Sequence, residues 1–191
     1  MKTLIFEIES IVPLLMHDDK TANPLNDFTK KLKALTGKRK KTDEDHAAIA
    51  EVEWTASLYY ENGKYIIPTK VLEAALLASA KQFKKGTLLK QCVIVSDDLV
   101  LDFKDKNLTP EKLYKVAGYA DMRTVKIGQA KTTRCRPLFN SWKGEFTVIL
   151  DDEKLNAEEI EQIVSNAGKY VGLCDYRPRY GRFEVTNFKS L

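Results

Sequence analysis

The sequence predicts an α+β fold, because segments with the two-residue period of strands alternate with segments that have the period of helices. Residues 3–12 alternate apolar and polar side chains, which is the pattern of a strand buried on one face. Residues 156–171 instead place apolar side chains three or four positions apart, as in an amphipathic helix. Strands and helices are therefore expected in the same chain.

The middle of the chain predicts further elements. Thr42 and Asp45 form a capping-box pattern, so a helix is expected over 43–59. Pro68 precedes a second helical pattern, which continues to residue 83. Strands are expected at 65–67, 92–95, 99–103, 146–150 and 183–185, and short helices at 28–35 and 109–111. This order is that of a ferredoxin-like β-α-β-β-α-β unit with insertions and with its helices on one face of the sheet.

The length and composition favour a single domain. A chain of 191 residues with 43% hydrophobic residues can bury one core, so we expect one domain over 1–191. Two insertions are expected within it: a polar, basic segment at about 16–41, and a basic hairpin at about 121–138 with Gly128 near its turn.

Several classes of protein are disfavoured by what the sequence lacks. No apolar run reaches the roughly 20 residues of a membrane helix, and the first strand does not have the apolar core of a signal peptide. The 3 cysteines of the chain are widely spaced and form no CxxC pair, so neither a disulfide framework nor a zinc site is expected. We expect a cytoplasmic protein with no membrane contact, no metal and no cofactor, since phosphate-binding and dinucleotide-binding motifs are also missing.

The distribution of charge indicates a polyanionic partner more strongly than the net charge of +4 does. Residues 30–41 contain seven bases and no acid, and residues 123–143 contain six bases and no acid. The first run is equally consistent with a solvated surface and with a flap that contacts nucleic acid. The second run coincides with the expected basic hairpin.

The segment from Gly172 to Phe183 is the strongest candidate for a binding surface. Glycine permits positive φ and close approach of the backbone to a ligand. Gly172 and Gly181 bracket a loop whose arginine and tyrosine side chains suit phosphate contacts and base stacking. The alternative is that the arginines pair with surface acids and the tyrosines pack. The candidate residues are Tyr176, Arg177, Arg179, Tyr180 and Arg182.

The expected hairpin supplies a second group of candidates. Basic side chains that project from one two-stranded arm could follow a nucleic-acid backbone. Phe139 or Trp142 could stack on a base, although burial in a core is the more common use of such rings. The candidates here are Arg123, Lys126, Lys131, Arg134, Arg136 and Trp142.

Catalysis has weaker support. His17 lies next to Asp18, and His46 lies next to Asp45; these are the 2 histidines of the chain. A ribonuclease could use either one as a general base. The alternative, a surface histidine in a polar segment, is more common.

Three stretches carry a family resemblance. The first strand runs into Ile11-Val12-Pro13-Leu14-Leu15, the segment 65–76 is similar to an "IPGSSLKGALR" helix start, and a glycine-containing loop precedes the last strand. Together they resemble the RAMP superfamily, the ferredoxin-like RNA-binding subunits of CRISPR effector complexes, especially the backbone subunits. The chain also resembles proteins encoded by phages. The resemblance implies that the glycine loop and the helix start lie against RNA or single-stranded DNA, and that copies assemble along a strand.

Three functions follow as hypotheses. The leading one is a non-enzymatic protein that binds single-stranded nucleic acid, RNA more than DNA, alone, as a homo-oligomer or with effector-complex subunits. The second is a metal-independent endoribonuclease of the same fold, with His17 or His46 as its base. The third is a phage-encoded interaction protein that imitates a backbone subunit and inhibits antiviral defence.

Overall fold

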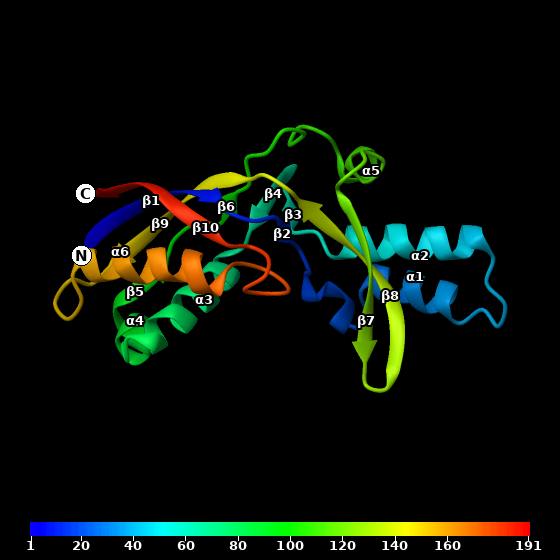
Figure 1. Cartoon of the computed structure of the whole chain (residues 1–191), viewed down its shortest axis with the longest axis horizontal. Coiled ribbons are helices and arrows are strands. Elements are labelled where there is room, and N and C mark those ends of the chain that lie inside the picture. The colour runs from blue at the N-terminus through cyan, green and yellow to red at the C-terminus, as the bar shows by residue number, and fades with distance from the viewer. The chain divides into compact units, whose positions relative to one another are not determined.

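The computed structural model describes the backbone of all 191 residues and the side chains of all except Ile127 and Ala130. Helices and antiparallel sheets occur together (Figure 1), which confirms the predicted α+β class. The chain divides into two compact units. Unit 1 comprises residues 1–14, 60–106 and 140–191, and unit 2 comprises residues 15–59 and 107–139.

The elements of unit 1 are β1 (Lys2–Ser10), β3 (Tyr60–Glu61), β4 (Lys64–Ile67), α3 (Thr69–Gln82), α4 (Gly86–Cys92), β5 (Val93–Val95), β6 (Leu99–Val100), β9 (Lys143–Leu150), α6 (Ala157–Asn166) and β10 (Phe183–Ser190). Four strands form a sheet in the order β10-β1-β9-β5, and each is antiparallel to its neighbours. A smaller sheet has the order β3-β4-β6. The first strand of the chain is therefore central, paired with segments far along the sequence.

The alternation in the first strand determines which of its faces is buried. Leu4, Phe6 and Ile8 are buried, which confirms the strand expected over 3–12 as Lys2–Ser10. The Phe6 ring lies between its partners on the two neighbouring strands, with ring centroids 5.4 Å from Phe146 and 4.9 Å from Phe188. Each such aromatic pair contributes about 0.5–1.5 kcal/mol beyond the burial of its apolar area. These stacked rings therefore help to fix the register of the three strands.

Helices α3 and α6 lie on the same side of the four-stranded sheet (Figure 1) and pack against each other. The buried Ser79 hydroxyl on α3 donates a hydrogen bond of 2.7 Å to the carbonyl of Ile163 on α6. Gly168 lies in a π-helical turn, Ala167–Val171, that continues α6. A Cβ at Gly168 would lie 2.2 Å from the carbonyl oxygen of Phe183, so glycine permits close packing against β10.

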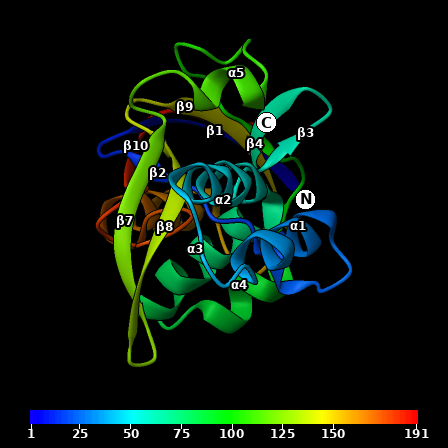
Figure 2. The same cartoon turned by 90° about the vertical axis from the view of Figure 1, so that its right-hand side faces the viewer.

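Unit 2 begins at Leu15, the second residue of β2 (Leu14–Leu15). It contains a 3₁₀ turn (Asp19–Ala22), α1 (Asp27–Thr36), α2 (Asp43–Ala56), α5 (Pro110–Tyr114), β7 (Ala120–Ile127) and β8 (Ala130–Phe139). Its sheet has the order β2-β8-β7, and β7 pairs antiparallel with β8 across a turn at residues 128–129. Figure 2 shows α1 and α2 side by side, with the β7–β8 ribbon next to α2.

The predicted capping box at the start of α2 is confirmed. The Thr42 hydroxyl accepts a hydrogen bond from the Asp45 backbone amide at 3.3 Å, and the Asp45 carboxylate accepts one from the Thr42 amide at 3.1 Å. The helix ends at Ala56, three residues earlier than expected. Leu58 and Tyr59 continue the apolar pattern past this end because they are also buried.

Trp54 on α2 anchors the core of unit 2. Its side chain is fully buried, and its indole N–H donates a hydrogen bond of 2.7 Å to the carbonyl of Tyr119. Its ring meets that of Tyr114 on α5 edge to face at 5.3 Å. Burial of one large apolar side chain stabilises a fold by about 1.5–3 kcal/mol. None of the helices in the described part of the chain has the length and apolar content needed to traverse a lipid bilayer.

Candidate nucleic-acid interface

The loop between α6 and β10 is held together at its neck by two glycines. The Leu173 amide donates a hydrogen bond of 2.9 Å to the carbonyl of Gly181, and the Gly181 amide donates one of 2.8 Å to the carbonyl of Pro13. Gly172 and Gly181 have φ values of +80° and +73°. A Cβ on Gly181 would lie 2.0 Å from the Leu173 carbonyl oxygen, so only glycine fits there.

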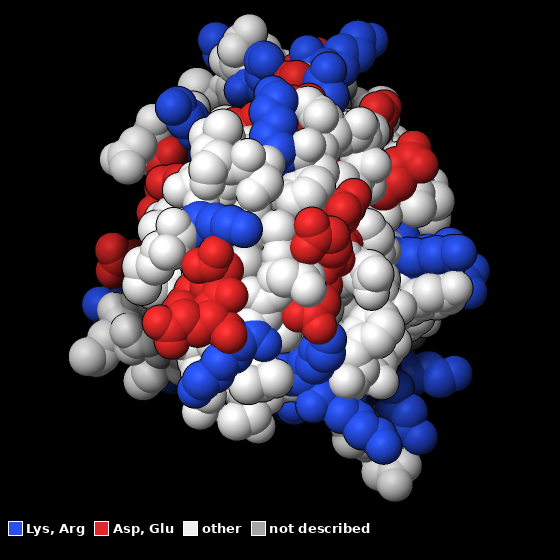
Figure 3. All heavy atoms as spheres, turned by 90° about the vertical axis from the view of Figure 1, so that its left-hand side faces the viewer, with Lys and Arg blue, Asp and Glu red and all other residues white. Residues whose placement is uncertain are grey.

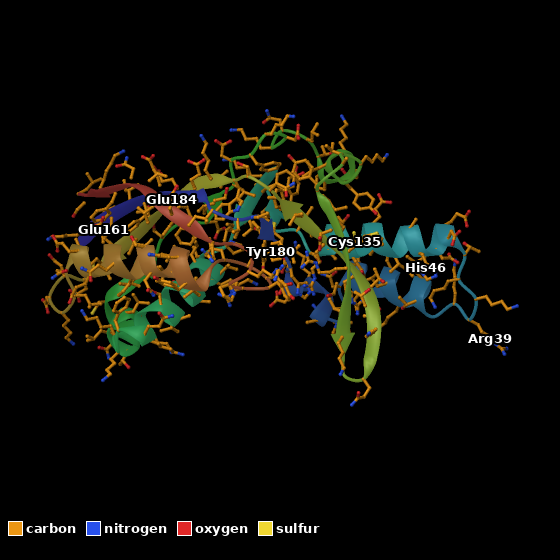
Figure 4. The ribbon with its side chains drawn as sticks, in the orientation of Figure 1. Arg39, His46, Cys135, Glu161, Tyr180 and Glu184 are labelled. Atoms are coloured by element: carbon orange, nitrogen blue, oxygen red, sulfur yellow. The ribbon has the colours of Figure 1, made fainter. Side chains whose placement is uncertain are left out.

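The apex of this loop presents aromatic and cationic side chains to solvent. Tyr176 is 55% exposed, and its ring lies 5.8 Å from that of Tyr180 at an angle of 45°. Arg177 and Arg179 are exposed, and neither forms an ion pair with another residue that the structure describes. Figure 4 shows Tyr180 in this loop of unit 1. Guanidinium groups beside exposed rings can hold phosphates while the rings stack on bases.

Two residues of the loop lie deeper than its apex. Arg182 is half-buried, and its Nε has no hydrogen-bond partner among the described residues. Burial raises the pKa of the Cys174 thiol to about 12, and Arg177 opposes this effect only in part. Cys174 is therefore a protonated thiol at neutral pH, and not a nucleophile.

At the start of α3, which the family resemblance implies lies against nucleic acid, a backbone amide is already hydrogen bonded to a carboxylate of the chain. The Thr69 backbone amide donates a hydrogen bond of 2.7 Å to the Asp98 carboxylate. A carboxylate at a helix N-terminus satisfies a free amide and interacts favourably with the helix dipole. It also places a negative charge where a phosphate would have to bind.

The pairing of β7 with β8 divides the basic residues of this segment between two faces. Arg123 lies opposite Arg134, and Lys126 lies opposite Lys131, two pairs that are three positions apart along β7. Because successive side chains of a strand point to opposite faces, these two pairs lie on different faces. The basic side chains therefore do not form one stripe along a single face.

Several of these arginines have acidic partners within unit 2. Arg123 forms a two-point ion pair with Asp121, with Nη2 2.8 Å from Oδ1. Arg134 forms an ion pair with Glu53 on α2, whose second oxygen accepts a hydrogen bond of 3.1 Å from the Cys135 amide. Lys126 and Lys131 are exposed. The guanidinium groups of Arg123 and Arg134 are thus engaged in ion pairs within the chain. The two lysines near the turn are the more accessible positive charges.

The aromatic candidate in this region is buried. Trp142 is 1% exposed, its ring meets that of Phe183 at 6.4 Å, and its indole N–H donates a hydrogen bond of 3.3 Å to the carbonyl of Val12. Phe139 is fully buried as well. Neither ring is accessible to a base in this structure, so both fit the alternative of burial in a core. Burial of so large an apolar surface stabilises the fold more than exposure would.

The two histidines lie in different places within unit 2. His46 is exposed on α2, and Figure 4 shows it well away from Cys135 on β8. His17 lines a cavity that also includes Cys135. His17 is exposed to solvent on one side, but its pKa lies below its ordinary value because its ring loses part of its hydration, and because Arg136 and Arg134 lie nearby. Among the described residues, no group of three or more histidine, cysteine, aspartate or glutamate side chains could hold a metal ion.

The basic run over 30–41 covers the end of α1 and the turn that follows it. Lys38 forms an ion pair of 2.5 Å with Asp45 at the start of α2, and the Lys41 ammonium donates a hydrogen bond of 3.0 Å to the carbonyl of Lys38. Arg39 is exposed at this turn (Figure 4). Part of the run therefore stabilises the turn between α1 and α2.

Unit 1 is not uniformly basic. Figure 3 shows acidic and basic side chains interleaved over the face that includes the chain termini. Asp152 there forms ion pairs with the N-terminal amine at 3.4 Å and with Lys2 at 3.5 Å. Exposed pairs of this kind are screened by solvent and contribute little to stability. This face offers no continuous positive surface for a polyanion.

Sequence reasoning missed the residues that line the cavity of unit 2. Thr29, Leu32, Lys33 and Thr36 on α1 contribute to its wall. Their spacing of three, four and seven positions is that of one helix face, and it could have been read from the sequence. No family model matches the chain, and a search of curated proteins found no match.

Proposed function

We propose that the chain binds single-stranded nucleic acid through the loop between α6 and β10. The observation that carries this proposal is the loop apex, where two exposed arginines without ion-pair partners among the described residues lie between the exposed ring of Tyr176 and the half-buried ring of Tyr180. The glycine neck supports it further, because a loop that is fixed before binding loses less conformational entropy when it binds. The resemblance to RAMP proteins favours RNA over DNA.

We further propose that unit 1 is a ferredoxin-like unit. The sequence β1, α3, β5, β9, α6 and β10 has the β-α-β-β-α-β order of that unit. The sheet order β10-β1-β9-β5, with the first strand between the last and the third of these strands, supports this assignment. In this frame the proposed binding loop is the connection between the second helix and the last strand.

Fluorescence anisotropy with labelled single-stranded RNA and DNA tests the binding proposal. Replacement of both arginines, Arg177→Ala with Arg179→Ala, is expected to weaken binding at least about tenfold, because two charge-assisted phosphate contacts are lost. The matched control is Lys104→Ala with Lys154→Ala. It removes the same charge from exposed positions of unit 1 outside the loop and should leave affinity unchanged. An unchanged dissociation constant in the arginine variant would exclude the loop as the contact.

A further inference from the structure

Unit 2 contains an open cavity of about 710 Å³. One wall is the face of α1 that carries Leu32 and Lys33, and another is formed by Val125, Arg134 and Arg136 on the β7–β8 ribbon. Figure 2 shows the helices and the ribbon that provide these walls. The volume lies within the roughly 300–1,000 Å³ that is usual for small-molecule sites.

The side chains around this cavity are mainly cationic. Lys33, Lys126, Arg134 and Arg136 contribute to the lining, and Glu53 is the single acid among the described lining residues. Glu53 already accepts hydrogen bonds from Arg134 and from the Cys135 amide. Lys126 reaches the lining from the face of the ribbon opposite to Arg134, so its charge is counted separately. With His17 neutral, the other three cations against Glu53 give a net charge of about +2, and Lys126 raises it to about +3.

The arginines of the lining lie close enough together to repel each other. The pKa of Arg136 is lowered by burial, and further by the charges of Arg134 and of Arg123 outside the lining, while Glu53 and Asp121 oppose the shift. An anion in the cavity would reduce this repulsion and would compensate for the partial loss of hydration. Lys33 and Lys126 form no ion pair with another described residue, so their ammonium groups are available to a ligand.

Two of the threonine hydroxyls in the lining already donate hydrogen bonds within the chain, so they have no proton left to donate to a ligand. The Thr29 hydroxyl donates to the carbonyl of Thr21 at 3.1 Å, and the Thr36 hydroxyl donates to the carbonyl of Leu32 at 2.7 Å. Recognition must therefore depend mainly on the cationic side chains. Several cations around one volume favour a group with more than one negative charge, and guanidinium groups match the geometry of phosphate.

We propose that this cavity binds the phosphate of a nucleotide, with the basic side chains around the phosphate and with Leu32 and Val125 against the less polar part of the ligand. The site lies in unit 2 and is built from residues other than those of the loop in unit 1. It therefore does not depend on the proposed function of that loop. The nucleotide phosphate can belong to a free mononucleotide or to the 5′ end of a strand.

Isothermal titration calorimetry with the full chain can distinguish these sources. AMP, ATP and adenosine test the free ligands, and a short oligonucleotide with or without a 5′ phosphate tests the strand end. Binding of AMP or ATP but not adenosine, or tighter binding of the 5′-phosphorylated oligonucleotide than of the unphosphorylated one, supports the proposal and identifies the source. Adenosine that binds as tightly as AMP overturns it, as does the absence of AMP and ATP binding at millimolar concentration together with equal affinity for the two oligonucleotides.

Variants on the surface of the cavity test its position without disturbing the core. Lys33→Ala and Lys126→Ala are each expected to weaken binding of the phosphorylated ligand about fivefold. Lys31→Ala is the matched control on α1, since Lys31 is exposed and outside the lining. An equal effect of Lys31→Ala would show diffuse attraction in place of a site.

The variant Arg177→Ala with Arg179→Ala should bind AMP and ATP as the original chain does, and should keep any preference for the 5′-phosphorylated oligonucleotide over the unphosphorylated one. This separates the two proposals: failure of loop binding leaves the affinity for AMP and ATP unchanged, and failure of the cavity leaves binding of the unphosphorylated single strand unchanged. Loss of nucleotide binding in the loop variant would contradict a site in unit 2.

Discussion

Single glycines determine whether the proposed binding loop can form. A Cβ at Gly181 would meet the oxygen and nitrogen of Leu173 at 2.0 and 2.7 Å, both backbone atoms that cannot move aside, and φ is already +73°. Gly181→Ala is therefore expected to cost about 3 kcal/mol or more of unfolding free energy. Urea unfolding followed by circular dichroism measures this loss.

Gly63→Ala is the matched control in the same unit. Gly63 has φ of +78°, but nothing lies within 4 Å of a Cβ there. Only the left-handed backbone conformation opposes alanine, at a cost of about 1–2 kcal/mol. Equal losses in the two variants would mean that the neck of the loop is not as tightly packed as the geometry indicates.

His17 makes stability depend on pH. Its pKa in the folded chain is lowered from 6.5 by burial, Arg136 and Arg134, while Asp18 and Asp19 oppose the shift. Below pH 6.5 the unfolded chain takes up a proton that the folded chain resists, so stability falls as the pH falls toward the folded pKa. Urea unfolding should show a larger loss between about pH 7.5 and about pH 5.5 for the original chain than for His17→Gln. Identical losses would remove His17 from this dependence, because the carboxylates titrate in both proteins.

The loop between α6 and β10 could be predicted from its single residues, but the burial of the aromatic side chain of Trp142 could not be established from them. Glycines that bracket arginine and tyrosine predict an exposed, constrained connection from local chemistry alone. Trp142 lies in the basic run over 123–143, yet it is buried, and its indole N–H donates a hydrogen bond to the carbonyl of Val12. A partner 130 positions away in the sequence is not visible to a local pattern.

Among the elements, those with strong local signals were predicted best. The capping box located the start of α2, and the two-residue alternation located β1. Helix α4 was missed because its seven residues begin at Gly86 and have no side-chain cap. The strand expected over 99–103 is shorter, because only Leu99–Val100 pairs with β4 in regular register.

The β7–β8 ribbon shows why a run of charge does not by itself define a surface. The six bases over 123–143 are evident in the sequence. Their division between two faces follows from the alternation along each strand and from the pairing of Arg123 with Arg134. The partners that occupy two of the arginines are an aspartate on the same strand and Glu53 on α2. Only tertiary structure brings Glu53 to that position.

At the scale of the whole molecule, two segments that are far apart in the sequence fold into one compact unit. Residues 15–59 and 107–139 form unit 2, so the polar segment at 16–41 and the basic segment at 121–138 lie in one compact body. The cavity lined by α1, α2 and the ribbon exists only because of this arrangement. No local pattern predicts it, since its walls come from residues about 100 positions apart.

The small net charge of the chain leads to a final prediction about salt. A charge of +4 gives weak long-range attraction, and the acidic and basic side chains interleaved in Figure 3 weaken it further. Affinity for single-stranded nucleic acid must then depend on local phosphate contacts, each of which contributes about 0.7 to the slope of log K against log salt concentration. Arg177→Ala with Arg179→Ala should reduce the magnitude of this slope by about 1.4 if both arginines contact phosphates.

Lys104→Ala with Lys154→Ala lowers the net charge by the same amount and should leave the slope unchanged, because neither lysine lies in the loop. Anisotropy titrations over a series of salt concentrations measure both slopes. A common reduction in the two variants would show that total charge, and not the loop, governs binding. An unchanged slope with weaker binding in the arginine variant would assign the arginines to stacking or to loop structure, because counterions are released only when phosphates are contacted.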